Sequence, residues 1–156
     1  MKQRNSPGIY IPVPIFYAAF FFFAYLLQNE FSIAYKLLQT EASDIVGWIF
    51  IVAGLAHVGA AWIQFIRTSN SVTTIKPANN LQTGGVYKFS RNPMYIGFFF
   101  MYFGAAFIWG NWWTFIVSPF LVLVIDLYVV NREEKYLRRK FGHDYKEYKK
   151  NVRKWL

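Results

Sequence analysis

The sequence predicts an all-α integral membrane protein with four transmembrane helices, the last two as a hairpin, and a cytoplasmic amphipathic carboxy-terminal helical segment. Of its 156 residues, 55% are hydrophobic and 22% are aromatic, which is more apolar than a soluble domain of this size. The apolar residues fall into four blocks without Lys or Arg, and a helix of about 20 apolar residues crosses a bilayer. We expect one domain over residues 1–156, with spans at about 10–27, 45–66, 95–109 and 112–130.

The first and third blocks need separate comment. The first begins close to Met1, the position of a signal peptide, but it lacks a small-residue cleavage site and further blocks follow, so we expect a retained helix. The third block is short, because its fifteen residues reach only about 22 Å as a helix. Either this helix begins inside protein, or the third and fourth blocks form a hairpin that does not fully cross the membrane. Both alternatives place residues 91–97 at the membrane boundary.

Positive charges predict the orientation of the helices. Residues 28–44 carry one Lys and three acids, whereas residues 67–94 carry four Lys or Arg and no acid. Lys2 and Arg4 precede the first block, and Gly110-Asn111 forms a tight turn between the third and fourth blocks. We therefore expect a multi-pass protein with both termini and residues 67–94 on the cytoplasmic side.

The segment after the fourth block is strongly basic. From Asn131 onward it has ten Lys or Arg and four Asp or Glu, a net charge of +6. Its apolar residues recur every three or four positions, which predicts an amphipathic helix, with a break at Gly142. We expect this helix to lie along anionic lipid headgroups, its apolar stripe against lipid or against residues 67–94. Nucleic-acid binding is the competing interpretation, which the adjoining membrane spans disfavour.

Residues 84–97 are dense in glycine, proline, arginine and tyrosine where the third helix begins. The glycine pair permits backbone conformations and close ligand approach that other residues prevent. Pro93 suits a first helical turn, whose free amides attract anions. Arg91 offers a planar fork for a carboxylate, and the tyrosine rings offer flat faces for an adenine ring or a cation. The alternative is a loop that returns to the membrane, with Arg91 reaching lipid phosphates.

Two adjacent acids, Glu133 and Glu134, follow the fourth block. At the end of a helix the dipole disfavours negative charge, so the pair predicts a nearby cation: Arg91, Arg132 or a positively charged ligand. The alternative is pairing with the basic residues of the following turn, Arg138 and Arg139.

Asp126 is the one acid inside an apolar block, where a charge is costly and by default functional. It lies seven residues before Glu133 and therefore on nearly the same helix face. We expect it to pair with His57 of the second block, as a structural contact rather than in catalysis. The chain has no cysteine, which excludes disulfides, thiolate metal sites and a cysteine nucleophile, and we predict no metal site.

Two long motifs bracket the predicted hairpin. They are Leu81-x-x-Gly84-Gly85-Val86-Tyr87-x-x-x-Arg91-Asn92-Pro93-x-Tyr95-x-Gly97 and Glu133-Glu134-x-x-Leu137-x-x-x-Phe141-Gly142-x-x-Tyr145-x-x-Tyr148-x-x-x-Val152. In these motifs, which cover about the carboxy-terminal half, the chain resembles the isoprenylcysteine carboxyl methyltransferase family. That family consists of integral membrane enzymes related to phospholipid N-methyltransferases.

The resemblance implies methyl transfer from S-adenosylmethionine, with S-adenosylhomocysteine as product, at the cytoplasmic membrane surface. Residues 81–97 and 131–156 would enclose the cofactor. The predicted catalytic residues are Arg132, which would orient an acidic substrate, and Glu133. Asn92 stands where the family usually has a histidine, and asparagine can hydrogen-bond the cofactor but cannot titrate. The predicted cofactor-binding residues are Gly85, Val86, Tyr87, Arg91, Asn92, Pro93, Tyr95, Gly97 and Glu134.

We expect the acceptor to be a lipid-like or prenylated carboxylate that enters sideways from the membrane. Methylation of a phospholipid or another amine is the alternative reaction, and Asn92 keeps open a catalytically silent lipid-binding or scaffold protein. A small transporter or channel built on Asp126 and His57 is disfavoured, because four spans with one acid offer little pathway. The acceptor, the choice between O- and N-methylation and the oligomeric state stay open.

Overall fold

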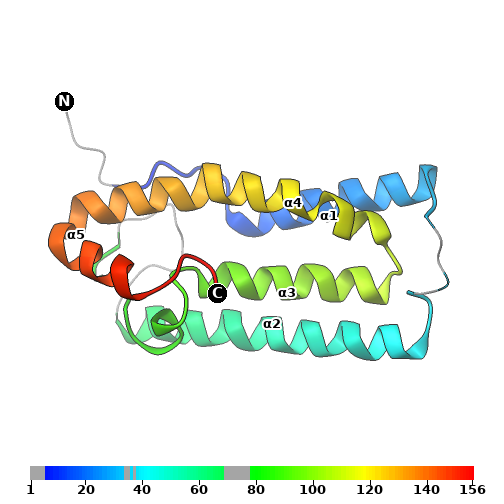
Figure 1. The fold of residues 1–156 in the computed structure, drawn as a ribbon, viewed down its shortest axis with the longest axis horizontal. Coiled ribbons are helices and arrows are strands. Elements are labelled where there is room, and N and C mark those ends of the chain that lie inside the picture. Colours follow the sequence, from blue (N-terminus) through cyan, green and yellow to red (C-terminus); the bar gives the residue numbers. More distant parts are fainter. Residues whose placement is uncertain (1–5, 34–35, 37, 69–77) are drawn as a thin grey trace.

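In the described part of the chain, four helices lie side by side with alternating direction, and a fifth begins where the fourth leaves the bundle (Figure 1). The computed structural model describes residues 6–33, 36, 38–68 and 78–156. Among these residues there is no β-strand, so the all-α prediction is confirmed. The helices are α1 (Val13–Glu30), α2 (Glu41–Arg67), α3 (Pro93–Ile108), α4 (Trp112–Val124) and α5 (Asn131–Asn151), with a 3₁₀ turn, η2 (Gly85–Lys88), before α3 and a π-helical turn, η3 (Ile125–Val130), between α4 and α5.

Local capping explains where two of the helices begin. The side chain of Thr40 accepts a hydrogen bond from the amide of Ser43 at 3.2 Å, at the start of α2. Asn111 accepts one from the amide of Thr114 at 3.3 Å, at the start of α4. Gly110 before it has φ of 63°, a left-handed conformation that favours glycine. The tight turn predicted between the third and fourth apolar blocks is therefore present.

Four glycines bring α2 and α3 into close contact. Gly47 and Gly54 on α2 face Gly104 and Gly97 on α3, so the same seven-residue spacing runs along both antiparallel helices. A Cβ atom at Gly54 would lie 2.6 Å from the carbonyl oxygen of Gly97. Small residues at such positions let helix backbones approach closely, as in membrane helix pairs. The α2–α3 contact is accordingly the most extensive one between helices of the described structure.

Aromatic side chains fill the space between α1 and α3. The ring of Tyr17 on α1 contacts Phe98, Phe99 and Tyr102 on α3, at centroid distances of 5.5, 5.1 and 6.1 Å. Its hydroxyl donates to the carbonyl oxygen of Tyr95 at 3.0 Å, so the buried polar group is satisfied. These contacts fix the first turns of α3, which carry part of the candidate site.

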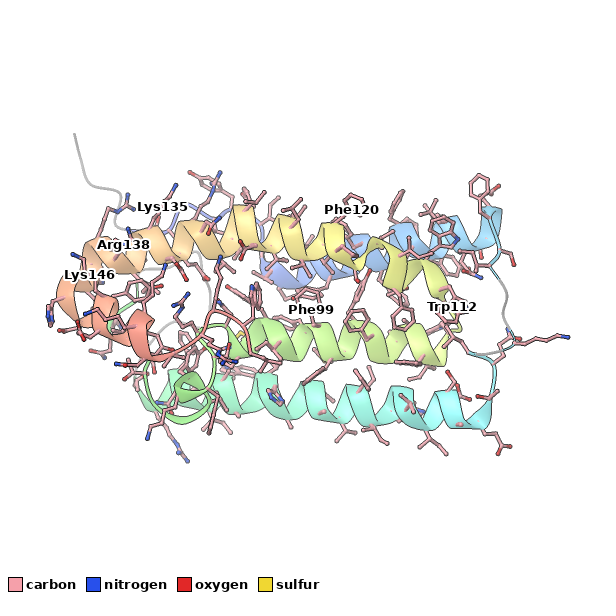
Figure 2. All side chains as sticks on the ribbon, in the orientation of Figure 1. Phe99, Trp112, Phe120, Lys135, Arg138 and Lys146 are labelled. Atoms are coloured by element: carbon pink, nitrogen blue, oxygen red, sulfur yellow. The ribbon has the colours of Figure 1, made fainter. Side chains whose placement is uncertain are left out.

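Large apolar side chains cover the outside of the bundle. Among the described residues, two helical segments are long and apolar enough to cross a membrane: α2 and the segment that begins at Trp112 and runs through α4 and η3 into α5. Helix α3 is apolar but shorter, with 16 residues or about 24 Å, as its sequence block predicted. This exposed apolar surface indicates a membrane protein. It includes Phe22, Phe23, Trp48, Val52, Leu55, Trp62, Ile66, Leu123 and the outward-pointing Phe120 of Figure 2.

The part of α5 before Gly142 continues the axis of α4 (Figure 1). The turn η3 joins them without a break, so Glu133 and Glu134 do not stand at a helix end, and the conflict with a helix dipole predicted there does not arise. At Gly142, with φ of 51°, the helix breaks as predicted. Beyond it the apolar stripe packs on the loop before α3, where the hydroxyl of Tyr148 donates to the carbonyl oxygen of Tyr87 at 2.7 Å.

The predicted contact between Asp126 and His57 is wrong. Asp126 in η3 forms an ion pair with Lys154, at 2.6 Å between Oδ1 and Nζ. Nδ1 of His57 lies 3.0 Å from the carbonyl oxygen of Ala53 in its own helix. The prediction failed because α3 lies between α2, which carries His57, and η3, which carries Asp126, so these two elements have no extensive contact (Figure 1).

We predict that Gly54→Ala and Gly97→Ala each lower the free energy of unfolding by about 1–3 kcal/mol, because the added methyl group meets the backbone of the facing helix. Gly59 is the matched control on α2, since a Cβ atom there would have no neighbour within 4 Å. Gly59→Ala should leave stability unchanged or raise it through the better helix propensity of alanine. Denaturant unfolding in detergent micelles measures the difference, and equal effects at positions 54 and 59 would contradict this packing.

Candidate active site

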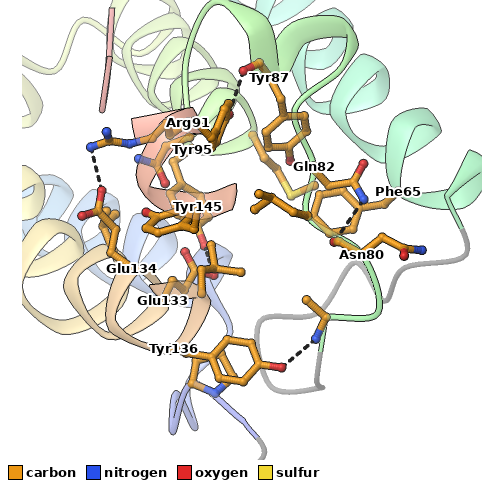
Figure 3. A pocket seen from close by; sticks show the side chains of 18 residues that line it. Phe65, Asn80, Gln82, Tyr87, Arg91, Tyr95, Glu133, Glu134, Tyr136 and Tyr145 are labelled. Carbon is orange, nitrogen blue, oxygen red and sulfur yellow. Dashed lines mark hydrogen bonds and ion pairs between the residues drawn. The ribbon is translucent and has the colours of Figure 1, made fainter. Parts of the chain in front are cut away.

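A cavity lies at the end of the bundle, where the loop before α3 meets α5 (Figure 3). Its described walls come from the segment before α1, α2, the loop before α3, the first turns of α3, the end of η3 and α5. Apolar side chains form much of the lining, as in most small-molecule sites. The lining tyrosines are Tyr87, Tyr95, Tyr136, Tyr145 and Tyr148, and the charged lining residues are Arg91, Glu133 and Glu134.

An ion network of Arg91, Glu134 and Lys149 holds one wall of the cavity. Nη2 of Arg91 donates to Oε1 of Glu134 at 2.7 Å, and Nζ of Lys149 lies 2.6 Å from Oε2 of the same carboxylate. The side chains of Arg91 and Glu134 are only 9% and 12% exposed, so each would be costly without its partner. Glu134 thus pairs with one of the two predicted arginines, and the alternative partners Arg138 and Arg139 are exposed.

Glu133 lines the cavity and has no cationic partner among the described residues. Its Oε1 accepts a hydrogen bond from the hydroxyl of Tyr95 at 2.8 Å. Burial raises the pKa of Glu133 to about 7; the hydrogen bond from Tyr95 opposes this rise, and the carboxylate of Glu134 adds to it. A carboxyl group in this state is ready to receive a cation, which would lower its pKa again.

The lining tyrosines provide hydroxyl groups and flat apolar faces. Besides the bond from Tyr148 to Tyr87, the hydroxyl of Tyr136 accepts a hydrogen bond from the amide of Ala78 at 3.1 Å. The ring of Tyr87 packs on Phe65 of α2, with centroids 5.7 Å apart. Burial raises the pKa of Tyr87 and Tyr148, so both hydroxyls stay protonated at neutral pH.

Six of the eleven predicted site residues line the cavity: Tyr87, Arg91, Asn92, Tyr95, Glu133 and Glu134. The two motifs therefore meet in space across the α3–α4 hairpin. The amide group of Asn92 is already engaged, because Nδ2 donates to the carbonyl oxygen of Lys154 at 2.8 Å. This position holds the segment after α5, a role that an asparagine performs without titrating.

Four other predicted residues shape the walls without lining the cavity. Gly85 adopts φ of 55° in η2, which also contains Val86. Pro93 is buried in the first turn of α3. Gly97 faces Gly54 in the contact between α2 and α3. The structure gives these residues a part in backbone geometry and helix packing.

Arg132, predicted to orient the substrate, lies away from the cavity. Its Nη1 donates to the carbonyl oxygen of Gly8 at 2.9 Å, and its guanidinium carbon lies 4.4 Å from the centroid of the Tyr128 ring. Successive residues of a helix point about 100° apart, so Arg132 and Glu134 point about 200° apart, and with Glu134 in the cavity wall Arg132 turns to the opposite side. The guanidinium of Arg132 therefore anchors the segment before α1.

Several lining residues have no individual role in the sequence-based prediction. These are Phe65, Gln82 and Tyr136, while Tyr145 and Tyr148 appear there only as positions of the amphipathic helix and of the second motif. A signal was present, because a tyrosine in a buried stripe needs a partner for its hydroxyl. The residues on α2 and in the loop gave no such signal, since only the packing of α2 against η2 brings them to the cavity.

The chain is similar to a Schizosaccharomyces pombe protein named protein-S-isoprenylcysteine O-methyltransferase, with 32% identity over 122 residues, 70% of this chain and 52% of that protein. A Saccharomyces cerevisiae protein of the same name is 29% identical over 126 residues, 74% of this chain and 49% of that protein. An uncharacterized Haemophilus influenzae protein is 43% identical over 47 residues, 30% of this chain and 75% of that protein. The chain spans about half the length of the two named relatives. No solved structure gives a significant match.

The sequence model of the phospholipid methyltransferase family matches residues 43–144. This range runs from the first turn of α2 into α5 and contains most of the cavity lining. It confirms the family relationship predicted from the two motifs. The protein belongs to the phospholipid methyltransferase family and is similar to the isoprenylcysteine O-methyltransferases.

Proposed function

We propose that the protein is a membrane enzyme that transfers a methyl group from S-adenosylmethionine to a lipid-like or prenylated carboxylate. The observation that supports this most is Glu133, a carboxyl group without a cationic partner among the described residues, in a tyrosine-rich cavity at the end of an apolar bundle. Relatives named as isoprenylcysteine O-methyltransferases make this reaction the first candidate.

The residues of the cavity fit S-adenosylmethionine. This molecule carries a positive amino group, a positive sulfonium, a carboxylate and a flat adenine ring. Glu133 offers the negative charge that an amino group requires, and Phe65 and Tyr87 offer ring faces. Nε of Arg91 is a buried donor without a partner in the described structure, as expected of a wall that a polar ligand completes.

When bound, S-adenosylmethionine supplies an electrophilic methyl group that an acceptor atom takes by in-line displacement. The part of the protein is to hold the acceptor in line and to keep water out. Glu133 would bind the amino group, and the Arg91–Glu134–Lys149 network would keep the wall in place. The lining tyrosines would exclude water. A carboxylate acceptor needs no general base, because its attacking oxygen carries no proton.

Methylation of an amine, such as a phospholipid headgroup, is the second candidate. Two observations favour it: Arg132 does not line the cavity to hold a carboxylate, and a pKa of about 7 suits Glu133 to accept a proton in a complex where it does not hold the amino group of the cofactor. In that reaction the amine would take the methyl group that the cofactor supplies, and Glu133 would accept the proton that the methylated nitrogen releases.

The proposed topology has four membrane spans, with both termini and the cavity on the cytoplasmic side. The apolar exteriors of α1, α2 and α4 support membrane spans. Helix α3 follows α2 and precedes α4 in the sequence, and it lies between α2 and the pair α1 and α4 in the bundle (Figure 1). Exposed basic side chains at the cavity end of the bundle would face anionic headgroups, among them Lys135, Arg138 and Lys146 (Figure 2). Three charges of the topology argument lie outside the described residues: Lys2, Arg4 and Lys76.

We predict that the wild-type protein binds S-adenosylhomocysteine and that its affinity for this ligand decreases as the pH is lowered below about 7. The amino group of the ligand requires an ionised Glu133, whose protonation around its pKa of about 7 weakens binding, by up to about tenfold per pH unit. Titration calorimetry between about pH 5.5 and about pH 8 measures this, and Glu133→Gln should bind at least about tenfold more weakly without the same dependence. If the wild-type protein binds no S-adenosylhomocysteine at any pH in this range, the proposal is contradicted.

Glu133→Gln and Glu134→Gln should change the stability of the ligand-free protein in opposite directions. Because the folded pKa of Glu133 is raised, its ionisation removes stability as pH rises from 4.5 to about 7, so Glu133→Gln should add up to about 3 kcal/mol above pH 7. Glu134→Gln should cost about 3 kcal/mol, because Arg91 loses its buried partner. Thermal unfolding compares the two variants, and a loss of stability in both would contradict these roles.

The acceptor is identified by the chemistry of the product. With labelled S-adenosylmethionine and total membrane lipid or a prenylated peptide, we expect an alkali-labile methyl ester from a carboxylate and an alkali-stable N-methyl group from an amine. Glu133→Gln should lower the rate about 100-fold if Glu133 takes the proton of an amine, and should act mainly on KM if the acceptor is a carboxylate. Equal transfer by the wild type and the variant at low cofactor concentration would argue against either role.

A further inference from the structure

The residues that follow α5, Val152–Leu156, lie across the start of α3, and we call them the strap. The loop before α3 binds the backbone of the strap. The amide of Arg91 donates to the carbonyl oxygen of Arg153 at 3.0 Å, and Nδ2 of Asn92 donates to that of Lys154 at 2.8 Å. The strap has no regular hydrogen bonding of its own in this range, so these bonds define its path.

Two side chains of the strap anchor it on the opposite side. Nζ of Lys154 lies 2.6 Å from Oδ1 of Asp126 in η3, and it donates to Oδ1 of Asn131 at 3.3 Å. The ring of Trp155 packs edge-on against Phe99 of α3, with centroids 6.2 Å apart, beside the aromatic core. The strap therefore bridges the start of α3 and the π-helical turn that leads into α5.

The strap also sets the orientation of Arg91. Nη1 of this arginine donates to the carbonyl oxygens of Lys149 and Val152, at 3.2 Å each, while Nη2 donates to Glu134 at 2.7 Å. One planar guanidinium thus donates to the end of α5 and the strap through one nitrogen and to the cavity acid through the other. A displaced strap would remove the bond to Val152, one of the two that Nη1 makes, and so weaken the hold that keeps the guanidinium toward Glu134.

We propose that Asp126 and Lys154 are positioning residues: their ion pair holds the strap, and the strap holds Arg91 toward Glu134. This inference rests on the proposed function of the cavity as a cofactor site. Neither residue lines the cavity, so both act through the strap. The two side chains are 27% and 28% exposed, so solvent screens the pair in part and a moderate effect is expected. The pair also accounts for an acid within an apolar block.

Asp126→Asn and Lys154→Gln should each weaken binding of S-adenosylhomocysteine about tenfold. In the transfer assay, each should raise the KM for S-adenosylmethionine about tenfold and change kcat less than about twofold. The double variant Asp126→Lys with Lys154→Asp should recover most of the binding, because it restores the pair with reversed charges. Lys150→Gln is the matched control, since it removes an exposed pair with Glu147 on α5 and should leave binding unchanged.

A second measurement follows the strap without any ligand. The chain has no cysteine, so Ser90→Cys introduces a single thiol at a position that is 2% exposed and whose hydroxyl lies 3.4 Å from the carbonyl oxygen of Lys154. Its reaction with a maleimide should be slow, and at least about tenfold faster when Asp126→Asn is added, because strap opening limits access. Addition of Lys150→Gln should not change the rate.

The outcomes separate the two proposals. A wild type that binds no S-adenosylhomocysteine contradicts the proposed function, and the maleimide rates still decide whether the ion pair holds the strap. Equal rates with and without Asp126→Asn overturn the inference. If the wild type binds S-adenosylhomocysteine and both single variants bind it as tightly as the wild type does, the inference is also overturned. Should a single variant fail to fold, the charge-swapped protein decides: folded protein with recovered binding supports the ion pair, and its failure to recover overturns it.

Discussion

The pairing of Arg91 with Glu134 is the interaction on which the candidate site depends. Both groups are nearly buried, so each needs the other to offset the loss of hydration. Lys149 completes the pairing from beyond the break at Gly142, at 2.6 Å from the second carboxylate oxygen. The loop before α3 and both parts of α5 are therefore tied to one carboxylate. This explains how segments far apart in sequence enclose one cavity.

Glu133, the adjacent residue, has the opposite character. It faces the same cavity with a hydrogen bond from Tyr95 and no cation, and burial raises its pKa to about 7. Glu134 thus stabilises the wall of the cavity through its ion pairs, whereas Glu133 is a buried carboxyl group that a positively charged ligand would stabilise. Sites that bind ligands often keep such an unfavourable group, at a cost to the stability of the free protein.

The sequence predicted the helices well, because long apolar blocks, a Gly-Asn turn and Gly142 are strong local signals. It also predicted that the loop around Arg91 and the paired acids would approach each other. It did not predict Gly97 as a packing residue, although the seven-residue glycine spacing on α2 and α3 was a readable signal. The partner of Asp126 could not be predicted, because it depends on where the chain returns after α5. The direction of Arg132 depends on which of the two residues beside Glu133 faces the cavity, which the sequence does not show.

The cavity is a cofactor site only if Glu133 receives the amino group of the cofactor. An experimental structure of the complex with S-adenosylhomocysteine in lipid would test this. We expect the amino nitrogen of the ligand within hydrogen-bond distance of a Glu133 carboxylate oxygen, about 3 Å, with the Arg91–Glu134 pair intact. A ligand bound elsewhere, or in this cavity with its amino group away from Glu133, would contradict it.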